Sequence, residues 1–166
     1  MFLRRFFARK VDISQDLYEA IVAAARQEKF YGEWGVPDTV DGRFDMIILH
    51  VFLVLDRLKS GGAATLDLRQ SLTDSFFRDM DRSLREMGVG DLSVGKKVRK
   101  MAEAFYGRVA AYAGALDASG DVSDVIRRNI FPDGSNKDVS ALATWVKVAR
   151  AHLSTQDVTK GEVIFP

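Results

Sequence analysis

The chain has 166 residues, of which 47% are hydrophobic and 28% charged, the composition of one globular domain with a sizeable core. Its 24 Lys and Arg nearly balance 23 Asp and Glu, which excludes a globally basic nucleic-acid-binding protein and an acidic solvating segment. Without cysteine there is no disulfide framework, catalytic thiol or thiolate metal site, and the chain fits a reducing compartment. The longest apolar run, residues 46–55, is well short of the ~20 residues that span a bilayer.

Helical spacing of apolar residues dominates the chain and predicts an all-α, single-domain bundle of about six helices. The first helix is expected from a cap at Ser14 to about Lys29. The second follows a turn at 38–42 and stops at 60–62; it is apolar on nearly all sides, which predicts a buried central helix. The other four are expected near residues 66–87, 91–116, 121–131 and 138–153.

No repeat, low-complexity tract or linker divides the sequence. We therefore expect a basic and aromatic N-terminal segment at 1–13, a helical domain at 14–153 and a C-terminal tail at 154–166. The tail has weak periodicity and is left without an assigned structure.

Two short motifs near the start of the fourth predicted helix resemble catalytic signatures but are incomplete. Residues 90–97 match seven positions of a phosphate-binding loop, and Lys97 then stands where a magnesium-binding hydroxyl is required. The pair Ser93 and Lys96 has the spacing of a penicillin-recognising nucleophile, yet its companion motifs are missing. We interpret this region as a glycine-rich turn between helices, with Ser93 as a capping hydroxyl.

Histidines and acidic residues give no sign of a metal or acid/base site. With only His50 and His152, the zinc spacing His-Glu-x-x-His does not occur, and we predict neither a metal nor a cofactor. His50 lies on an apolar helix and is expected in the core or a groove, although an axial haem ligand stays open on chemical grounds. The acids at 79, 81, 86 and 91 are typical of a solvated helix surface.

Basic residues gather at two places, and the rest of the chain carries a net negative charge. The first patch has the composition of a short membrane-surface anchor, with a disordered solubilising start as the alternative. Its candidate residues are Phe2, Arg4, Arg5, Phe6, Phe7, Arg9 and Lys10. The second patch is Lys96, Lys97, Arg99 and Lys100. Between the patches, Phe76 and Phe77 require a wide apolar face, so one of them is a candidate for a partner groove.

The third and fourth predicted helices carry a pattern that resembles the ubiquinol-cytochrome c chaperone family. The similarity begins at Asp41-Gly42-Arg43-Phe44-Asp45-Met46 and continues through residues 49–59. It is densest from Phe76 to Leu92, and it runs on through Gly95-Lys96-Lys97-Val98 and Phe105-Tyr106-Gly107-Arg108 to Tyr112. It covers about residues 14–150.

The resemblance implies a helical, non-enzymatic chaperone that binds newly made cytochrome b and promotes assembly of the cytochrome bc1 complex. A small partner protein, the ribosome near its exit site and an anionic membrane surface are the further partners expected, and DNA is not. Because the sequence shows no long transit peptide, we expect a bacterial-type member, cytoplasmic and peripheral to the inner face of the inner membrane. The candidate client- or partner-binding residues are Phe76, Phe77, Asp79, Asp81, Arg85, Asp91, Lys96, Lys97, Arg108 and Tyr112.

Two other functions are weighed against this one. A haem-handling or small-molecule enzyme of the same pathway needs a pocket with convergent titratable groups. A ribosome- or RNA-binding module using residues 96–100 needs a steep dependence on salt. A chaperone instead needs an exposed apolar patch or groove.

Overall fold

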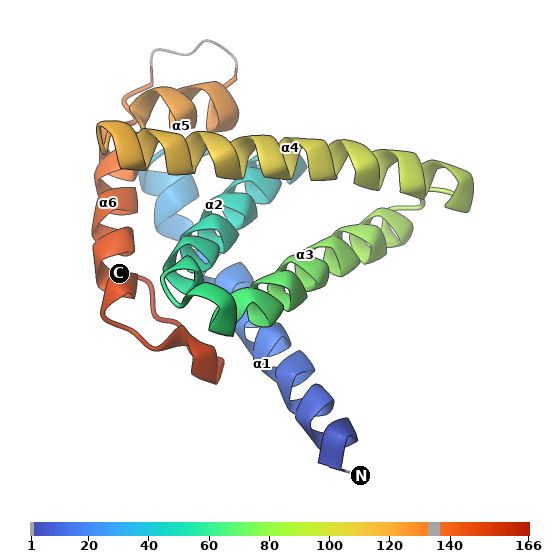
Figure 1. The fold of residues 1–166 in the computed structure, drawn as a ribbon. Coiled ribbons are helices and arrows are strands. Elements are labelled where there is room, and N and C mark those ends of the chain that lie inside the picture. Colours follow the sequence, from blue (N-terminus) through green and yellow to red (C-terminus); the bar gives the residue numbers. More distant parts are fainter. Residues whose placement is uncertain (1, 133–136) are drawn as a thin grey trace.

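The computed structural model describes the backbone of residues 2–132 and 137–166, with side chains from residue 13 onward in those ranges (Figure 1). Within them the chain is all-α, as predicted. Its helices are α1 (Phe2–Ala25), α2 (Val40–Lys59), α3 (Leu66–Glu86), α4 (Asp91–Ala118), α5 (Ser123–Ile130) and α6 (Ser140–Ser154). Three single turns also occur, at Lys29–Glu33, Gly62–Thr65 and Val158–Lys160.

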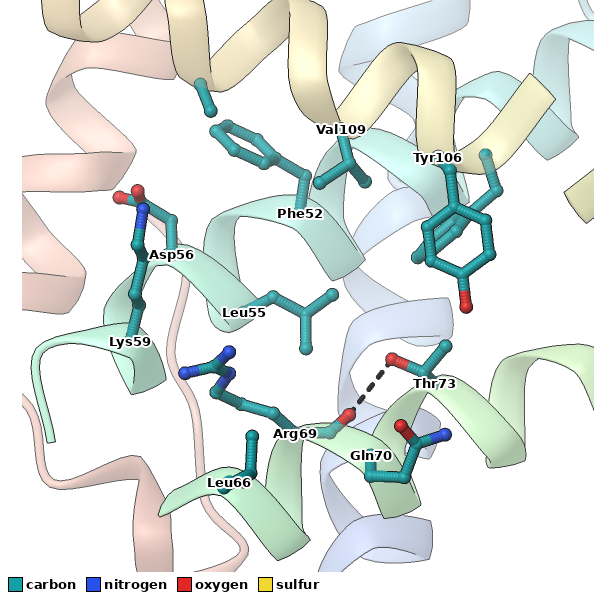
Figure 2. Close-up of a pocket in the computed structure, with 12 residues that line it drawn as sticks. Phe52, Leu55, Asp56, Lys59, Leu66, Arg69, Gln70, Thr73, Tyr106 and Val109 are labelled. Atoms are coloured by element: carbon teal, nitrogen blue, oxygen red, sulfur yellow. Dashed lines mark hydrogen bonds between the residues drawn. The ribbon is translucent and has the colours of Figure 1, made fainter. Parts of the chain in front are cut away.

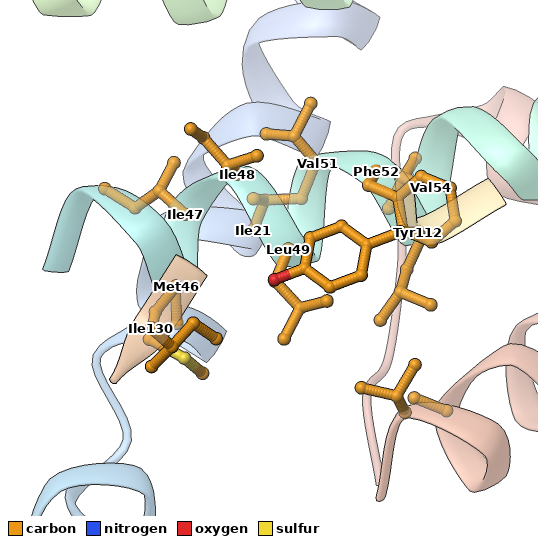
Figure 3. Close-up of a cluster of buried hydrophobic side chains, with 14 of the residues drawn as sticks. Ile21, Met46, Ile47, Ile48, Leu49, Val51, Phe52, Val54, Tyr112 and Ile130 are labelled. Atoms are coloured by element: carbon orange, nitrogen blue, oxygen red, sulfur yellow. The ribbon is translucent and has the colours of Figure 1, made fainter. Parts of the chain in front are cut away.

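The central helix is α2, as its apolar sequence predicts. The Thr39 hydroxyl begins it by accepting a hydrogen bond from the Gly42 amide at 3.0 Å. Helices α1, α3, α4, α5 and α6 all contact α2, and side chains from several of them surround it (Figure 3). A run of ten residues from Asp45 to Val54 is buried without interruption. The middle of α2 is therefore enclosed by the surrounding helices on all its sides.

Helices α3 and α4 form a hairpin that extends away from the other helices (right side of Figure 1). The connecting turn contains Gly88 at φ +87°, a left-handed conformation that glycine adopts without strain. The Val89 amide then donates to the Leu84 carbonyl at 3.0 Å and closes the end of α3. The predicted glycine-rich turn between two helices is confirmed at this place.

The first helix differs from its prediction at both ends. Helix α1 already begins at Phe2, and Ser14 lies in its interior, buried, with its Oγ 3.5 Å from Ser75 Oγ of α3. Because residues 2–13 contain neither glycine nor proline, nothing in them stops the helix. Ser14 is therefore a packing residue rather than a cap. At the other end α1 stops at Ala25, and residues 29–33 form a separate π-helical turn.

The tail that sequence alone leaves unassigned packs on the core. The Phe165 ring lies 4.9 Å from the His50 ring and 6.3 Å from the Trp145 ring, centre to centre. The His50 Nδ1 lies 2.7 Å from the Met46 carbonyl oxygen, and burial lowers the pKa of His50 to about 4. The expectation of a core histidine is thus confirmed, and this histidine is neutral at physiological pH.

Candidate functional site

A groove of about 330 Å³ lies where α2, α3 and α4 face one another (Figure 2). Its floor is apolar, with Leu55 of α2 projecting into the space and Val109 of α4 above it (Figure 2). The lining residues are Phe52, Leu55, Asp56, Lys59, Leu66, Arg69, Gln70, Thr73, Phe105, Tyr106, Val109 and Ala113.

Two large apolar side chains stand exposed at the edge of this groove. Leu66 at the start of α3 is 55% exposed, and Tyr106 of α4 is 56% exposed. Both are exposed at the mouth of a depression that already has an apolar floor, so they extend the surface available to an apolar ligand. These features are typical of a surface that receives side chains from another chain.

The charged groups at the rim leave a positive surplus. Asp56 is held by Arg150 of α6, with Nε–Oδ2 and Nη2–Oδ1 distances of 2.8 and 3.3 Å. In the described part of the chain, Lys59 and Arg69 form no ion pair. The rim therefore presents two cations without an ion-pair partner, while its carboxylate is paired with Arg150, which also bonds Asp117 at 3.1 Å.

A contact between the half-buried Arg108 of α4 and the buried Asp45 of α2 joins these two helices. Arg108 Nη2 lies 3.0 Å from Asp45 Oδ1, and the Arg108 guanidinium lies 5.7 Å from the centre of the Phe44 ring. Burial raises the pKa of Asp45 to about 7, Arg108 opposes the rise, and Asp41 adds to it. In the same region, Tyr112 is buried, its hydroxyl has no hydrogen-bond partner among the described residues, and burial raises its pKa strongly. These groups fix α4 against α2 and thus the spacing of the groove walls.

Of the acidic residues expected on a solvated helix surface, Asp79 and Asp81 are instead half-buried and Asp91 is exposed, and all three form ion pairs. Asp79 accepts a hydrogen bond from the Tyr18 hydroxyl of α1 at 2.7 Å, and it also pairs with Arg82. Arg85 bonds Asp81 at 2.9 Å within α3 and pairs with Asp91 at the start of α4. Arg85 therefore connects the two arms of the hairpin.

The predicted aromatic and basic candidates divide between core and surface. Phe76 and Tyr112 have no exposed surface, so their assignment as partner-contacting residues is corrected: the Phe76 ring is stacked on Phe105, and Tyr112 on Phe52. Phe77 is half-buried beside Phe105. Lys96 and Lys97 are exposed on α4, and their role stays a prediction. Ser93 lies inside the first turn of α4, whose cap is Gly90, so Ser93 is not the cap.

The N-terminal anchor candidates, from Phe2 to Lys10, lie on α1, and their side chains are outside the described residues. None of the helices in the described ranges has the length and apolar character that crossing a bilayer requires. The same ranges contain no group of three potential metal ligands.

Sequence reasoning did not propose the groove residues Leu66, Arg69 and Tyr106 as binding residues. The groove is assembled from three helices, and periodicity within one helix does not reveal which faces meet. No signal in the sequence marks Tyr106, because a residue that follows a buried aromatic can be half-buried, as Phe77 is after Phe76, or exposed, as Tyr106 is after Phe105.

Known proteins that are similar to this chain identify its family. The family model for the ubiquinol-cytochrome C chaperone matches residues 32–160. A Xenopus laevis protein named ubiquinol-cytochrome-c reductase complex assembly factor 1 is 24% identical over 147 residues, 88% of this chain and 73% of that protein. Mouse and human proteins of the same name are equally similar, and this chain spans about half of their length.

The fold is also similar to a solved structure. The crystal structure of the Cbp3 homolog from Brucella abortus is 40% identical in sequence, with a TM-score of 0.87 that covers 99% of this chain and 94% of that one. The chain therefore belongs to the ubiquinol-cytochrome C chaperone family.

Proposed function

We propose that this chain is a non-enzymatic chaperone that binds newly made cytochrome b and promotes assembly of the cytochrome bc1 complex. Membership of the family and the names of its relatives support the assembly role. The observation that carries the binding role is the groove between α2, α3 and α4, with its apolar floor and its surplus of positive charge.

The groove suits an apolar helix of a membrane protein. Its volume of about 330 Å³ accommodates a few anchoring side chains of one helix rather than an entire membrane span. Lys59 and Arg69 at the rim complement the partial negative charge at the carboxyl end of a client helix, or an acidic residue flanking it. Such a site shields apolar side chains while a polytopic client awaits its partners.

The chemistry of the groove favours binding over catalysis. An enzymatic site brings a nucleophile or general base together with a group that stabilises developing charge. Here the one carboxylate of the lining, Asp56, is bound by Arg150. Of the two hydroxyls in the lining, Thr73 Oγ1 donates to the Arg69 carbonyl at 2.9 Å, and the other belongs to the exposed Tyr106.

The proposal also assigns a location and further partners. A chaperone for a membrane client acts where the client emerges, so we place the chain at the cytoplasmic face of the inner membrane as a peripheral protein. A small partner protein and the ribosome near its exit site belong to the same proposal.

Deletion and complementation test this function. Cells lacking the protein are expected to synthesise cytochrome b but to lose cytochrome b absorbance and bc1 quinol oxidation in their membranes. Leu66→Ser with Tyr106→Ser should fail to restore both readouts, whereas Val148→Ser, a 49% exposed apolar residue of α6, should restore them. Normal haem spectra and quinol oxidation in the deletion strain would contradict the proposal.

A further inference from the structure

The tip of the α3–α4 hairpin exposes two large apolar side chains that no part of the described fold covers. Leu92 in the first turn of α4 is 99% exposed, and Met87 at the end of α3 is 55% exposed. In Figure 1 the tip lies apart from every other helix. An exposed apolar pair at the outermost end of a hairpin serves no packing purpose within the fold.

A basic stripe follows the tip on the outer face of α4. Leu92, Lys96, Arg99 and Lys100 recur at spacings of three and four, which places them on one side of the helix. Val94 and Phe105 are buried on the opposite side. Lys97 widens the stripe, and all four basic side chains are exposed.

The nearby acids do not neutralise this stripe. Asp91 is paired with Arg85, and Glu86 lies 4.0 Å from Arg82. Glu103 is exposed at the far end of the stripe. Among the residues with described side chains, none pairs with the four basic residues of α4. Their charge is therefore available to an external partner.

We propose that this tip is a contact site for an anionic lipid surface. Cations within about 12 Å of the tip, at the helical rise of 1.5 Å per residue, are close enough to interact with lipid phosphates. Leu92 and Met87 supply the apolar insertion that a purely electrostatic partner such as RNA would not use. Charge and apolar exposure together therefore favour a membrane over a nucleic acid.

The hairpin tip and the groove share helix α4, so a lipid contact at the tip also positions the groove. Leu92 and Tyr106 lie on the same helix, about 21 Å apart along its axis. A hairpin tip resting on lipid headgroups thus holds the groove close to the membrane surface, within reach of a partly inserted client. The lipid contact itself does not depend on what the groove binds, so the two proposals can fail separately.

Because the chain has no cysteine, a single label can report this contact. The full chain with Leu92→Cys carries an environment-sensitive fluorophore and is mixed with vesicles of equal parts phosphatidylglycerol and phosphatidylcholine. We expect a blue shift with these vesicles, none with phosphatidylcholine alone, and none from the same label at Val148→Cys. Absence of a blue shift at position 92 overturns the proposal.

Variants separate charge from apolar insertion. Replacing the four basic residues of the stripe by Gln should weaken vesicle binding about 100-fold or more at low salt, because each contributes near anionic lipid. Leu92→Ser with Met87→Ser should weaken it about tenfold, also at high salt, where charge is screened. The matched control, which should keep wild-type binding, replaces four exposed basic residues elsewhere by Gln: Arg26, Arg128, Lys147 and Lys160.

Three results would overturn the assignment. Equal losses from the stripe and the control variants would show that only net charge matters. Vesicle binding as strong as that of wild type, by both the basic-stripe variant and the variant with Leu92→Ser and Met87→Ser, would assign any membrane contact to another segment, such as residues 2–10. Binding of ribosomes or RNA that needs the basic stripe but not Leu92, without vesicle binding, would assign the stripe to a nucleic acid. Circular dichroism of every variant confirms that the helices are intact.

Discussion

Arg108 Nη2 of α4 lies 3.0 Å from Asp45 Oδ1 of α2, and the carboxyl group in this pair is buried. The stacked rings of Tyr112 and Phe52 join the same two helices, about one turn further along α4 and two turns further along α2. Since Phe52 and Val109 also line the groove, the geometry of the binding surface depends on how α4 is seated on α2.

Replacement Asp45→Asn should change the pH dependence of stability. The native state holds the Asp45 proton up to about pH 7, whereas the unfolded chain releases it near 3.8, so this contribution to stability falls as pH rises between those values. The pKa of His50 is lowered to about 4 from the ordinary histidine value of 6.5, so the contribution of His50 to stability rises with pH between those values. Both proteins contain His50. The comparison with wild type therefore isolates Asp45.

The measurement is urea unfolding of both proteins from pH 4 to 8. The stability of Asp45→Asn relative to wild type should rise with pH, by at most about 4 kcal/mol, because one pKa unit corresponds to about 1.4 kcal/mol. A difference between the two proteins that does not vary with pH would show that Asp45 keeps an ordinary pKa.

Arg85→Gln should leave the chain folded but weaken its association with cytochrome b. Arg85 connects Asp81 of α3 to Asp91 of α4 in an exposed position, so its loss loosens the hairpin that forms two walls of the groove. Co-purification of cytochrome b with the tagged variant measures this effect. The control is Arg127→Gln, which removes an exposed pair with Asp124 on α5. Wild-type recovery of cytochrome b with Arg85→Gln would make this ionic contact irrelevant to binding.

Phe165→Ala should destabilise the fold by about 2 kcal/mol, because the substitution removes the contacts of the half-buried Phe165 ring with His50 and Trp145. Its neighbour Ile164 is 69% exposed, so Ile164→Ala serves as the control and should change stability little. Urea unfolding followed by tryptophan fluorescence measures both. Equal stability of the two variants would show that the tail does not contribute to the core.

Gly42→Ala should destabilise the chain by about 3 kcal/mol or more. A Cβ at this position would lie 1.9 Å from the Pro37 carbonyl oxygen, and the backbone there cannot give way without moving the start of α2. Gly95→Ala is the control: nothing lies within 4 Å of its Cβ, and removing a glycine from α4 should stabilise the helix by up to about 1 kcal/mol. Thermal unfolding of the two variants should shift in opposite directions, and a shift in the same direction would refute the close approach.

The helices could be predicted from the sequence because each one carries its own apolar periodicity, and α2 in particular is apolar all round. The start of α1 could not, because Ser14 looks like a cap until Ser75 of a distant helix is seen beside it. Phe76 and Tyr106 show the same limit for the site. Both are aromatic residues of helices, but only the packing of α3 against α4 decides that Phe76 is buried and Tyr106 exposed.

Photo-crosslinking in living cells tests the central claim most directly. A photoreactive amino acid is placed at Tyr106, in the groove, or at Val148 on α6, and the products are probed for cytochrome b after a short pulse of labelling. The account predicts a crosslink from position 106 to newly made cytochrome b and none from position 148. Crosslinks to cytochrome b from position 148 but not from 106, or from neither, would contradict it.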